Sequence, residues 1–185
     1  MQHSKTWIFW LGSLALVSLS GCESMSPSQC RMADWARQGY QDGLRGESQN
    51  RIADYAEDCG KVGIQPNPME YRRGWDSGIV QFCTPHNGWA QGLQGNSYKE
   101  NACQGQVGNP QFSYYFKIGM DAHRTQKQID TNNHETHRLQ RRLNEVKPSP
   151  KADEERRRIR EDLRRLDHDQ FRLRDLLSQQ QRYAP

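Results

Sequence analysis

Three aspartates at or near glycines are the residues of this chain best suited to acid–base chemistry, which uses carboxylates held close together. They are Asp42, Asp76 and Asp121. A catalytic pair must face each other and have pKa values that are driven apart, and their spacing along the chain establishes neither condition. We therefore expect these carboxylates to cap helices or to lie on the surface, and we predict no catalytic residue and no enzymatic activity.

Two histidines form the second suggestive spacing. His134 and His137 are three residues apart with Glu135 between them, and this spacing places both imidazoles on one face of a helix. A zinc site has three or four protein ligands, and the sequence offers no evident third ligand here. We therefore predict no metal site and no cofactor.

The first 21 residues have the three parts of a secretory signal peptide. A polar start carrying Lys5 precedes an apolar run from Trp7 to Val17, and small residues close the segment. A run of about eleven residues is too short for a helix to cross a bilayer core of about 30 Å. The segment therefore predicts export.

The tetrapeptide Leu-Ser-Gly-Cys that ends at Cys22 resembles the bacterial lipobox, whose cysteine is lipidated and becomes the new N-terminus. The alternatives are a signal peptide cut by a general peptidase and a buried helix. The resemblance implies that residues 1–21 are removed and that acyl chains on Cys22 anchor the protein, because two or more chains give stable attachment. Glu23 follows and, by resemblance to the sorting rule of enteric bacteria, favours the outer membrane. Residues 22–29 are then expected to form the lipidated N-terminus and a flexible spacer.

Four cysteines remain after the predicted anchor, and an even number in an exported chain implies disulfides. They are Cys30, Cys59, Cys83 and Cys103. Zinc is the alternative, but the long spacings and the lack of a Cys-x-x-Cys pair argue against it. Of three connectivities we favour Cys30–Cys59 with Cys83–Cys103, because a repeat in the chain would give each half its own pair.

That repeat is carried by glycines in two stretches 49 residues apart. The glycines are Gly39, Gly43 and Gly46 in the first copy, and Gly88, Gly92 and Gly95 in the second. Each copy is followed by a cysteine, by Asn-Pro, and by an aromatic residue three positions before a glycine, which pairs Tyr71-x-x-Gly74 with Phe116-x-x-Gly119. Four features in one order indicate an imperfect tandem duplication over about residues 30–123.

The repeated stretches carry helix signals. Asn67-Pro68 and Thr84-Pro85 each offer an N-cap followed by proline at the first helical position. Glycines at i, i+4 and i+7 share one helix face, where each costs about 1 kcal/mol relative to alanine. We expect close approach of another backbone to offset that cost. The alternative is that the glycines form turns in a loop-rich, disulfide-linked unit.

Aromatic residues beside the glycines define a candidate binding surface, formed by Trp35, Tyr71, Trp75 and Trp89. Exposed rings of this kind stack on sugars, so these four residues are candidates for a glycan-binding face. More often such rings supply the core of a domain that is poor in leucine and isoleucine. We favour the core role and keep the glycan-binding face as the alternative.

The order of glycine, aromatic and cysteine positions carries a family resemblance. On this chain the pattern is Trp35-x3-Gly39-x2-Asp42-Gly43-x2-Gly46, Tyr71-x2-Gly74-Trp75-x2-Gly78, Phe82-Cys83, Gly88-x3-Gly92-x2-Gly95-x2-Tyr98 and Cys103. It resembles a proteobacterial lipoprotein family known only as a domain of unknown function, over about residues 30–105 and the lipobox. The resemblance implies a periplasm-facing lipoprotein and supplies no activity and no catalytic residues.

After Gly119 the composition changes to charged residues and good helix formers without glycine. Residues 121–146 and 151–183 each predict a helix, with Pro148 and Pro150 between them. The second helix has a heptad seam with one polar position, formed by Ile159, Leu163, Leu166, Gln170, Leu173 and Leu177. We predict an antiparallel hairpin, and a single extended charged helix is the alternative.

The predicted fold is mainly α, with a disulfide-linked helical head of two related halves over residues 30–120 and a charged, coiled-coil-like helical hairpin over residues 121–185. The net charge of +4, with both signs mixed along the chain, is too weak to indicate nucleic-acid binding. We expect a non-enzymatic outer-membrane lipoprotein that faces the periplasm, bound to the membrane by its N-terminal lipid and to a protein partner by its C-terminal helices. A glycan- or lipopolysaccharide-binding module of the cell envelope is the alternative.

Overall fold

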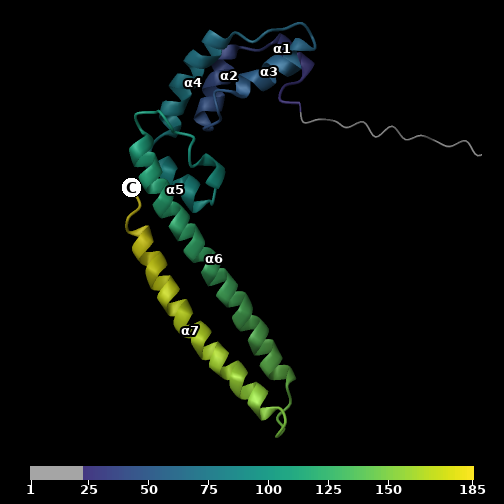
Figure 1. The fold of residues 1–185 in the computed structure, drawn as a ribbon, viewed down its shortest axis with the longest axis vertical. Helices are drawn as coiled ribbons and strands as arrows, with labels where there is room; N and C mark the ends of the chain where they lie inside the picture. The colour runs from purple at the N-terminus through teal and green to yellow at the C-terminus, as the bar shows by residue number, and fades with distance from the viewer. Residues whose placement is uncertain (1–22) are drawn as a thin grey trace, which may run out of the picture.

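A computed structural model describes residues 23–185, so the signal segment and Cys22 lie outside the described part. The chain forms a small helical head at one end and a long hairpin at the other (Figure 1). The helices are α1 (Pro27–Arg31), α2 (Trp35–Leu44), α3 (Arg51–Gly60), α4 (Pro68–Phe82), α5 (Pro85–Leu93), the short 3-10 helix η1 (Ser97–Lys99), α6 (Asn109–Glu145) and α7 (Asp153–Gln181). The predicted mainly α fold is confirmed.

Helices α2 and α4 cross so closely that only glycine fits between their backbones. A Cβ atom on Gly39 would lie 1.9 Å from the carbonyl oxygen of Tyr71, and one on Gly74 would lie 1.8 Å from that of Ala36. The next glycine on each helix, one turn further along, is also confined, because a Cβ atom would lie 2.5 Å from a backbone oxygen at Gly43 and 2.2 Å from one at Gly78. The expected close approach of backbones therefore explains why glycine, a weak helix former, recurs in these helices.

Helix α5 crosses the first turns of α6 in the same way. A Cβ atom on Gly88 would lie 2.4 Å from the carbonyl oxygen of Phe112, and one on Gly92 would lie 2.2 Å from that of Phe116. The head therefore consists of two helix pairs, α2 with α4 and α5 with α6, that share one packing scheme. We call them the first pair and the second pair.

The register of the second pair differs from the sequence prediction by one helical turn. A Cβ atom on Gly119 would lie 2.8 Å from the amide nitrogen of Leu93, and one on Gly78 would lie 2.9 Å from that of Leu44. Because Leu44 and Leu93 are equivalent in the two copies, Gly119 corresponds to Gly78 and not to Gly74. The pairing of Gly74 with Gly119 is therefore wrong.

The cause of this error is visible in α4 itself. The motif aromatic-x-x-Gly occurs there twice, as Tyr71-x-x-Gly74 and again one turn later as Trp75-x-x-Gly78. Phe116-x-x-Gly119 matches both equally well in sequence, and only the contacts with the facing helix distinguish the two registers.

The third glycine of each copy forms a turn and does not continue the helix face. Gly46 has a φ of +64° and Gly95 a φ of +76°, in the left-handed region that favours glycine. Each also lies against a ring, because a Cβ atom on Gly46 would be 2.5 Å from the ring of Phe82 and one on Gly95 would be 2.6 Å from that of His123. The helix and turn interpretations are thus both correct, for different glycines.

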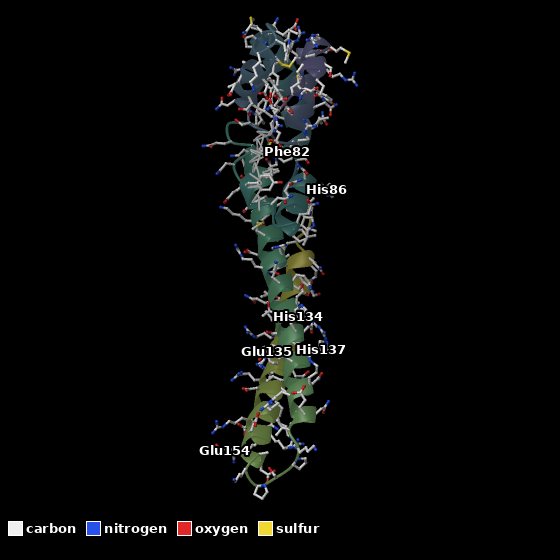
Figure 2. The ribbon with its side chains drawn as sticks, turned by 90° about the vertical axis from the view of Figure 1, so that its right-hand side faces the viewer. Phe82, His86, His134, Glu135, His137 and Glu154 are labelled. Carbon is white, nitrogen blue, oxygen red and sulfur yellow. A yellow bond between two sulfur atoms is a disulfide. The ribbon has the colours of Figure 1, made fainter. Side chains whose placement is uncertain are left out.

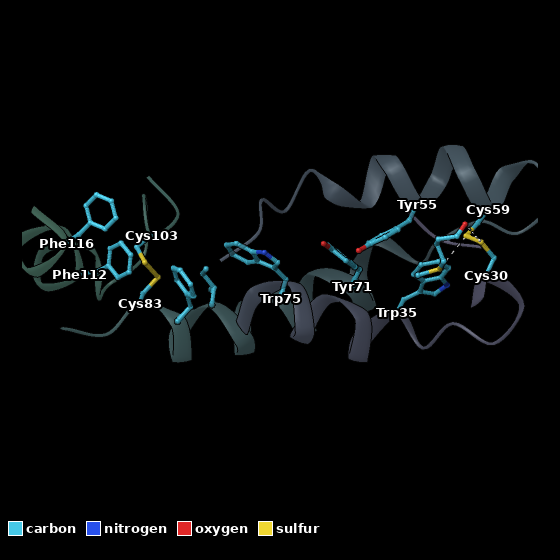
Figure 3. Packing of buried hydrophobic residues seen from close by; sticks show 13 residues of the cluster. Cys30, Trp35, Tyr55, Cys59, Tyr71, Trp75, Cys83, Cys103, Phe112 and Phe116 are labelled. Atoms are coloured by element: carbon cyan, nitrogen blue, oxygen red, sulfur yellow. Dashed lines mark hydrogen bonds between the residues drawn. A yellow bond between two sulfur atoms is a disulfide. The ribbon is translucent and has the colours of Figure 1, made fainter. Parts of the chain in front are cut away.

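Two disulfides close the head, Cys30–Cys59 and Cys83–Cys103, which is the favoured connectivity. Figure 3 shows the buried rings in a row that begins at the first disulfide, passes Tyr71 and Trp75, and continues beyond the second disulfide to Phe116. For loops of this length, chain-entropy models give about 3–4 kcal/mol of stabilisation per bridge. The bridges therefore strengthen a core that contains few aliphatic side chains.

The segment expected as a flexible spacer is part of the packed head. Ser26 caps α1, and its amide donates to the side chain of Gln29 at 2.8 Å in a reciprocal capping box. Met25 is buried, with its sulfur 3.7 Å from Sγ of Cys59. Part of the segment expected as a flexible spacer is therefore a helix start.

The hairpin begins inside the head, because α6 is one continuous helix. The expected boundary between residues 120 and 121 falls within it. Helix α7 packs back along α6 (Figure 1), and the seam buries Ile129 and Leu139 of α6 against Ile159 and Leu173 of α7. Within residues 23–185, no helix is both long enough and apolar enough to cross a membrane.

Candidate functional site

The most unusual side chain of the first pair is Asp42, a carboxylate that is fully buried in the head. Its Oδ2 accepts hydrogen bonds from the hydroxyls of Tyr55 and Tyr71, each at 2.9 Å. Its Oδ1 accepts from Nη2 of Arg45 at 2.5 Å and from Nε2 of Gln38 at 3.4 Å. We call these five residues the Asp42 network, which joins α2, α3 and α4.

The two tyrosines of this network are held in their protonated form. Burial, followed by the hydrogen bond to Asp42, raises the pKa of Tyr55 and that of Tyr71 above the usual value of a phenol. The hydroxyl of Tyr55 also accepts from Nε of Arg51 at 2.9 Å. Each phenol therefore acts as a fixed donor to the carboxylate.

This arrangement stabilises structure better than it could transfer protons. A carboxylate has about four acceptor sites, and four donors already occupy those of Asp42 in the absence of solvent. The expectation of a capping or surface role is therefore wrong for Asp42. It is correct for Asp76 and Asp121, which lie on the surface, where Asp121 pairs with Arg124 and Asp76 accepts from Gln49 at 3.3 Å.

The second pair has amides where the first has the carboxylate. Gln91 occupies the place of Asp42 in the repeat, and Asn87 that of Gln38. Nε2 of Gln91 donates to Oδ1 of Asn87 at 3.2 Å, and its Oε1 accepts from Nδ2 of Asn96 at 2.8 Å. The polar network thus persists in the second pair without a charge.

A polar cleft lies between the two pairs. It has a volume of about 500 Å³, and its lining includes Arg45 and Glu47 from the first pair and Gln91 and Asn96 from the second. At its edge stands Lys99, which is 7% exposed and whose Nζ donates to the Gly46 carbonyl at 3.1 Å and to Oε1 of Glu47 at 3.0 Å. Lys99 therefore connects the second copy to the C-terminal turn of α2.

One exposed aromatic ring lies beside the cleft, with the ammonium of Lys99 5.2 Å from the ring centre. Tyr98 is 76% exposed, lines the cleft, and also lines a second hollow of about 430 Å³ on its other side. The four aromatics predicted as a binding surface lie elsewhere, because Trp35, Tyr71 and Trp75 are buried in the core and Trp89 is half-buried. The favoured core role is thus correct for those three, and sequence reasoning missed Tyr98.

The two histidines meet no third metal-ligating side chain among the described residues. His134 and His137 are exposed on α6, and Glu135 is engaged by Arg138. Figure 2 shows the three about midway along the hairpin. Nowhere in residues 23–185 do three or more histidine, cysteine, aspartate or glutamate side chains gather in a way that could hold a metal ion.

The geometry defines a class of protein: a helical head of two glycine-packed pairs, closed by disulfides, that continues into a charged hairpin. A family model described as "Protein of unknown function (DUF2799)" matches residues 34–121. This match spans both helix pairs and ends where the hairpin leaves the head, in agreement with the resemblance to a family of unknown function. No curated protein and no solved structure matches the chain.

Proposed function

We propose that this chain is a lipid-anchored protein of the outer membrane that faces the periplasm and acts without enzymatic chemistry, by presenting its hairpin to a protein partner. The observation that carries the proposal is the continuity of α6. The helix packs at Gly119 against the backbone of α5 and then continues to Glu145. At about 1.5 Å per residue, this makes a stiff arm attached to the head without a hinge.

The arm carries a suitable contact point. Phe171 is the most exposed large apolar side chain of α7, at 78%. It lines a shallow hollow of about 540 Å³ together with Arg164, His168 and Arg174. Aromatic residues and arginines are enriched at the energetic centres of protein interfaces. This combination supports a protein partner rather than a small ligand on the hairpin.

The anchor rests on the N-terminal sequence. The lipobox-like tetrapeptide ending at Cys22 supports lipidation, and Glu23 supports the outer membrane. The two disulfides fit an exported protein, because such bridges persist in oxidising compartments.

The partner is sought with a photo-reactive amino acid introduced at Arg174, next to Phe171, in living cells. We expect one discrete protein adduct at this position. The adduct should fall several-fold in the Phe171→Ala variant and stay unchanged in the matched Leu176→Ala variant, because Leu176 is 41% exposed and outside the hollow. An adduct that is insensitive to Phe171→Ala, or no adduct, contradicts the proposal.

Glycan binding in the cleft is the second candidate, and the exposed ring of Tyr98 favours it. An exposed aromatic ring beside amide side chains offers stacking and hydrogen bonds together, which is the combination that sugars require. Retention on purified peptidoglycan should fall in Tyr98→Ala and persist in Tyr114→Ala, since Tyr114 is 56% exposed on α6. Equal retention of both variants contradicts this candidate.

A further inference from the structure

Near the start of the described chain, Ser24 is hydrogen-bonded to α3. The amide and the hydroxyl of Ser24 both donate to Oδ2 of Asp58, at 2.6 and 2.7 Å. Nζ of Lys61 donates to the other oxygen of the same carboxylate at 2.7 Å. Lys61 and then Ser24 hold the pKa of Asp58 well below its usual range. The carboxylate of Asp58 therefore stays charged at any physiological pH. We call these contacts the Ser24 latch.

Two further contacts hold the chain directly after the latch. Met25 is 8% exposed against the Cys30–Cys59 disulfide, and Ser26 caps α1. Between Ser24 and the start of α1, the chain therefore has no free linker.

This geometry limits the distance between the head and an anchored lipid. Only Glu23 separates Ser24 from Cys22, and two residues of extended chain span about 7 Å. We propose that the end of the head formed by α1 and α3 lies directly against the bilayer surface, so that the lipid anchor orients the whole molecule. This inference rests on the proposed lipidation of Cys22.

Two exposed side chains at this end, Met32 and Arg31, suit a phospholipid surface. Met32 is 79% exposed at the end of α1, and it lines the same small hollow as Met25. Arg31 is exposed beside it. An apolar side chain that enters the headgroup region, next to a cation that meets anionic phosphates, is the combination found at membrane-facing surfaces.

The orientation gives the hairpin a defined reach. In Figure 1 the N-terminal end of the head and the turn between α6 and α7 lie at opposite ends of the molecule's long axis. A helix of 37 residues is about 55 Å long. With the α1–α3 end on the membrane, the turn of the hairpin lies far from the membrane surface. A flexible spacer would instead have allowed the hairpin to lie along that surface.

The test compares photo-crosslinking to lipid from two positions in the full, acylated protein. The protein, with acylation of Cys22 verified by mass, is placed in vesicles of phosphatidylethanolamine and phosphatidylglycerol. A photo-reactive amino acid at Met32 should form lipid adducts at least about fivefold more often than one at Pro148. Inserting eight Gly/Ser residues between Glu23 and Ser24 should remove that excess, because it lengthens the tether and leaves the fold untouched.

The outcomes separate this inference from the proposed function. Acylated protein whose Met32 adducts do not exceed those at Pro148, or whose excess survives the insertion, overturns the inference and leaves the anchor intact. Protein without acyl chains on Cys22 overturns the anchor, and the inference with it.

The latch itself is tested by hydrogen exchange at the amide of Ser24. In Asp58→Ala this amide should exchange about tenfold faster or more, as expected for the loss of a hydrogen bond to a charged acceptor. The matched variant Glu57→Ala removes an equal charge one residue away, on an exposed side chain, and should leave the rate unchanged. Equal rates in both variants mean that Asp58 does not hold Ser24.

Discussion

The two helix pairs of the head share one backbone design and differ in what they enclose. The first pair has glycine at all four crossing positions, whereas the second has Tyr115 in the place of Gly74. The first encloses a carboxylate, Asp42, and the second an amide, Gln91. Backbone contact thus fixes the crossing, while the polar residues around it are free to differ.

Because of this difference, polar side chains contribute differently to the stability of the two pairs. In the first pair, the Asp42 network spans three helices. Removing one donor leaves one acceptor site of the buried carboxylate empty, and removing Asp42 leaves the buried hydroxyl of Tyr71 without its acceptor. In the second pair, the amides face the cleft and can bond to water. We therefore expect polar substitutions to cost more in the first pair, and backbone-contact substitutions to cost about the same in both.

The largest expected effect comes from filling the crossing. Gly74→Ala places a Cβ atom 1.8 Å from the carbonyl oxygen of Ala36, so the helices must separate, at a cost of about 4 kcal/mol or more in the free energy of unfolding. The matched change in the second pair, Gly92→Ala, places a Cβ atom 2.2 Å from the carbonyl oxygen of Phe116 and should cost about the same. Guanidinium denaturation measures both.

A control glycine separates contact from helix propensity. A Cβ atom on Gly60 would lie 3.7 Å from the side chain of Gln65, an ordinary contact, so Gly60→Ala should leave stability unchanged or raise it by up to about 1 kcal/mol. If Gly74→Ala behaved like Gly60→Ala, backbone contact would not be what fixes the crossing.

Removal of one disulfide at a time is expected to have the next largest effect. Replacing Cys30 and Cys59 by alanine, or Cys83 and Cys103, should each cost about 3 kcal/mol, because loops of 29 and 20 residues differ little in closure entropy. Denaturation without reductant measures the cost. A much larger loss of stability in one double variant would show that the part of the head closed by that disulfide depends on it for folding.

The Asp42 network provides the third test. Tyr71→Phe removes a donor from a buried carboxylate and should cost about 2 kcal/mol. In the second pair Phe112 already occupies the place of Tyr71, and Gln91→Ala should cost about 1 kcal/mol or less. Equal losses of stability in the two variants would mean that the charge of Asp42 does not make its network more important than the amide network of the second pair.

High pH should weaken the first pair selectively. The pKa values of Tyr55 and Tyr71 are raised in the folded protein, whereas an unfolded tyrosine titrates near pH 10. Their contribution is therefore fully present below about pH 10 and declines as the pH rises above it. Between pH 9 and 11, stability should fall less steeply in Tyr71→Phe than in the natural protein, and amides of α2 and α4 should lose hydrogen-exchange protection before those of α5.

Local chemistry made much of the head predictable. The N-caps Asn67 and Thr84 form as their sequences indicate, and the disulfide pairing follows from the repeat. The hairpin seam follows from its heptad spacing, with Gln170 bonded to Asn133 at 2.8 Å. These features depend on neighbours in sequence or on a single period.

The features that escaped prediction depend on residues distant in sequence. The residues next to Asp42 in sequence do not indicate that Tyr55 and Tyr71 donate hydrogen bonds to it. Its position three residues after Gly39 indicates only that it lies on the crossing face of α2. The latch between Ser24 and Asp58 spans 34 positions. Such contacts need the packed helices before they can be recognised.

The smallest expected effect comes from replacing the ring that lies against the turn glycine of the second pair. Phe82 lies under Gly46 and His123 under Gly95, and Nδ1 of His123 lies 3.0 Å from the carbonyl oxygen of Leu93. His123→Phe gives the second pair the ring that the first pair uses, and it should change the free energy of unfolding by less than about 1 kcal/mol.

The reverse exchange should not be neutral, because the two rings have different surroundings. Phe82 is 4% exposed, and an imidazole in its place would be buried beside the ammonium of Lys99, 5.8 Å from the ring centre. Phe82→His should therefore cost about 3 kcal/mol and lose further stability as the pH falls below about 6.5, where the unfolded imidazole binds a proton. If both exchanges were equally mild, the two turns would be interchangeable in their side chains as well as in their backbone.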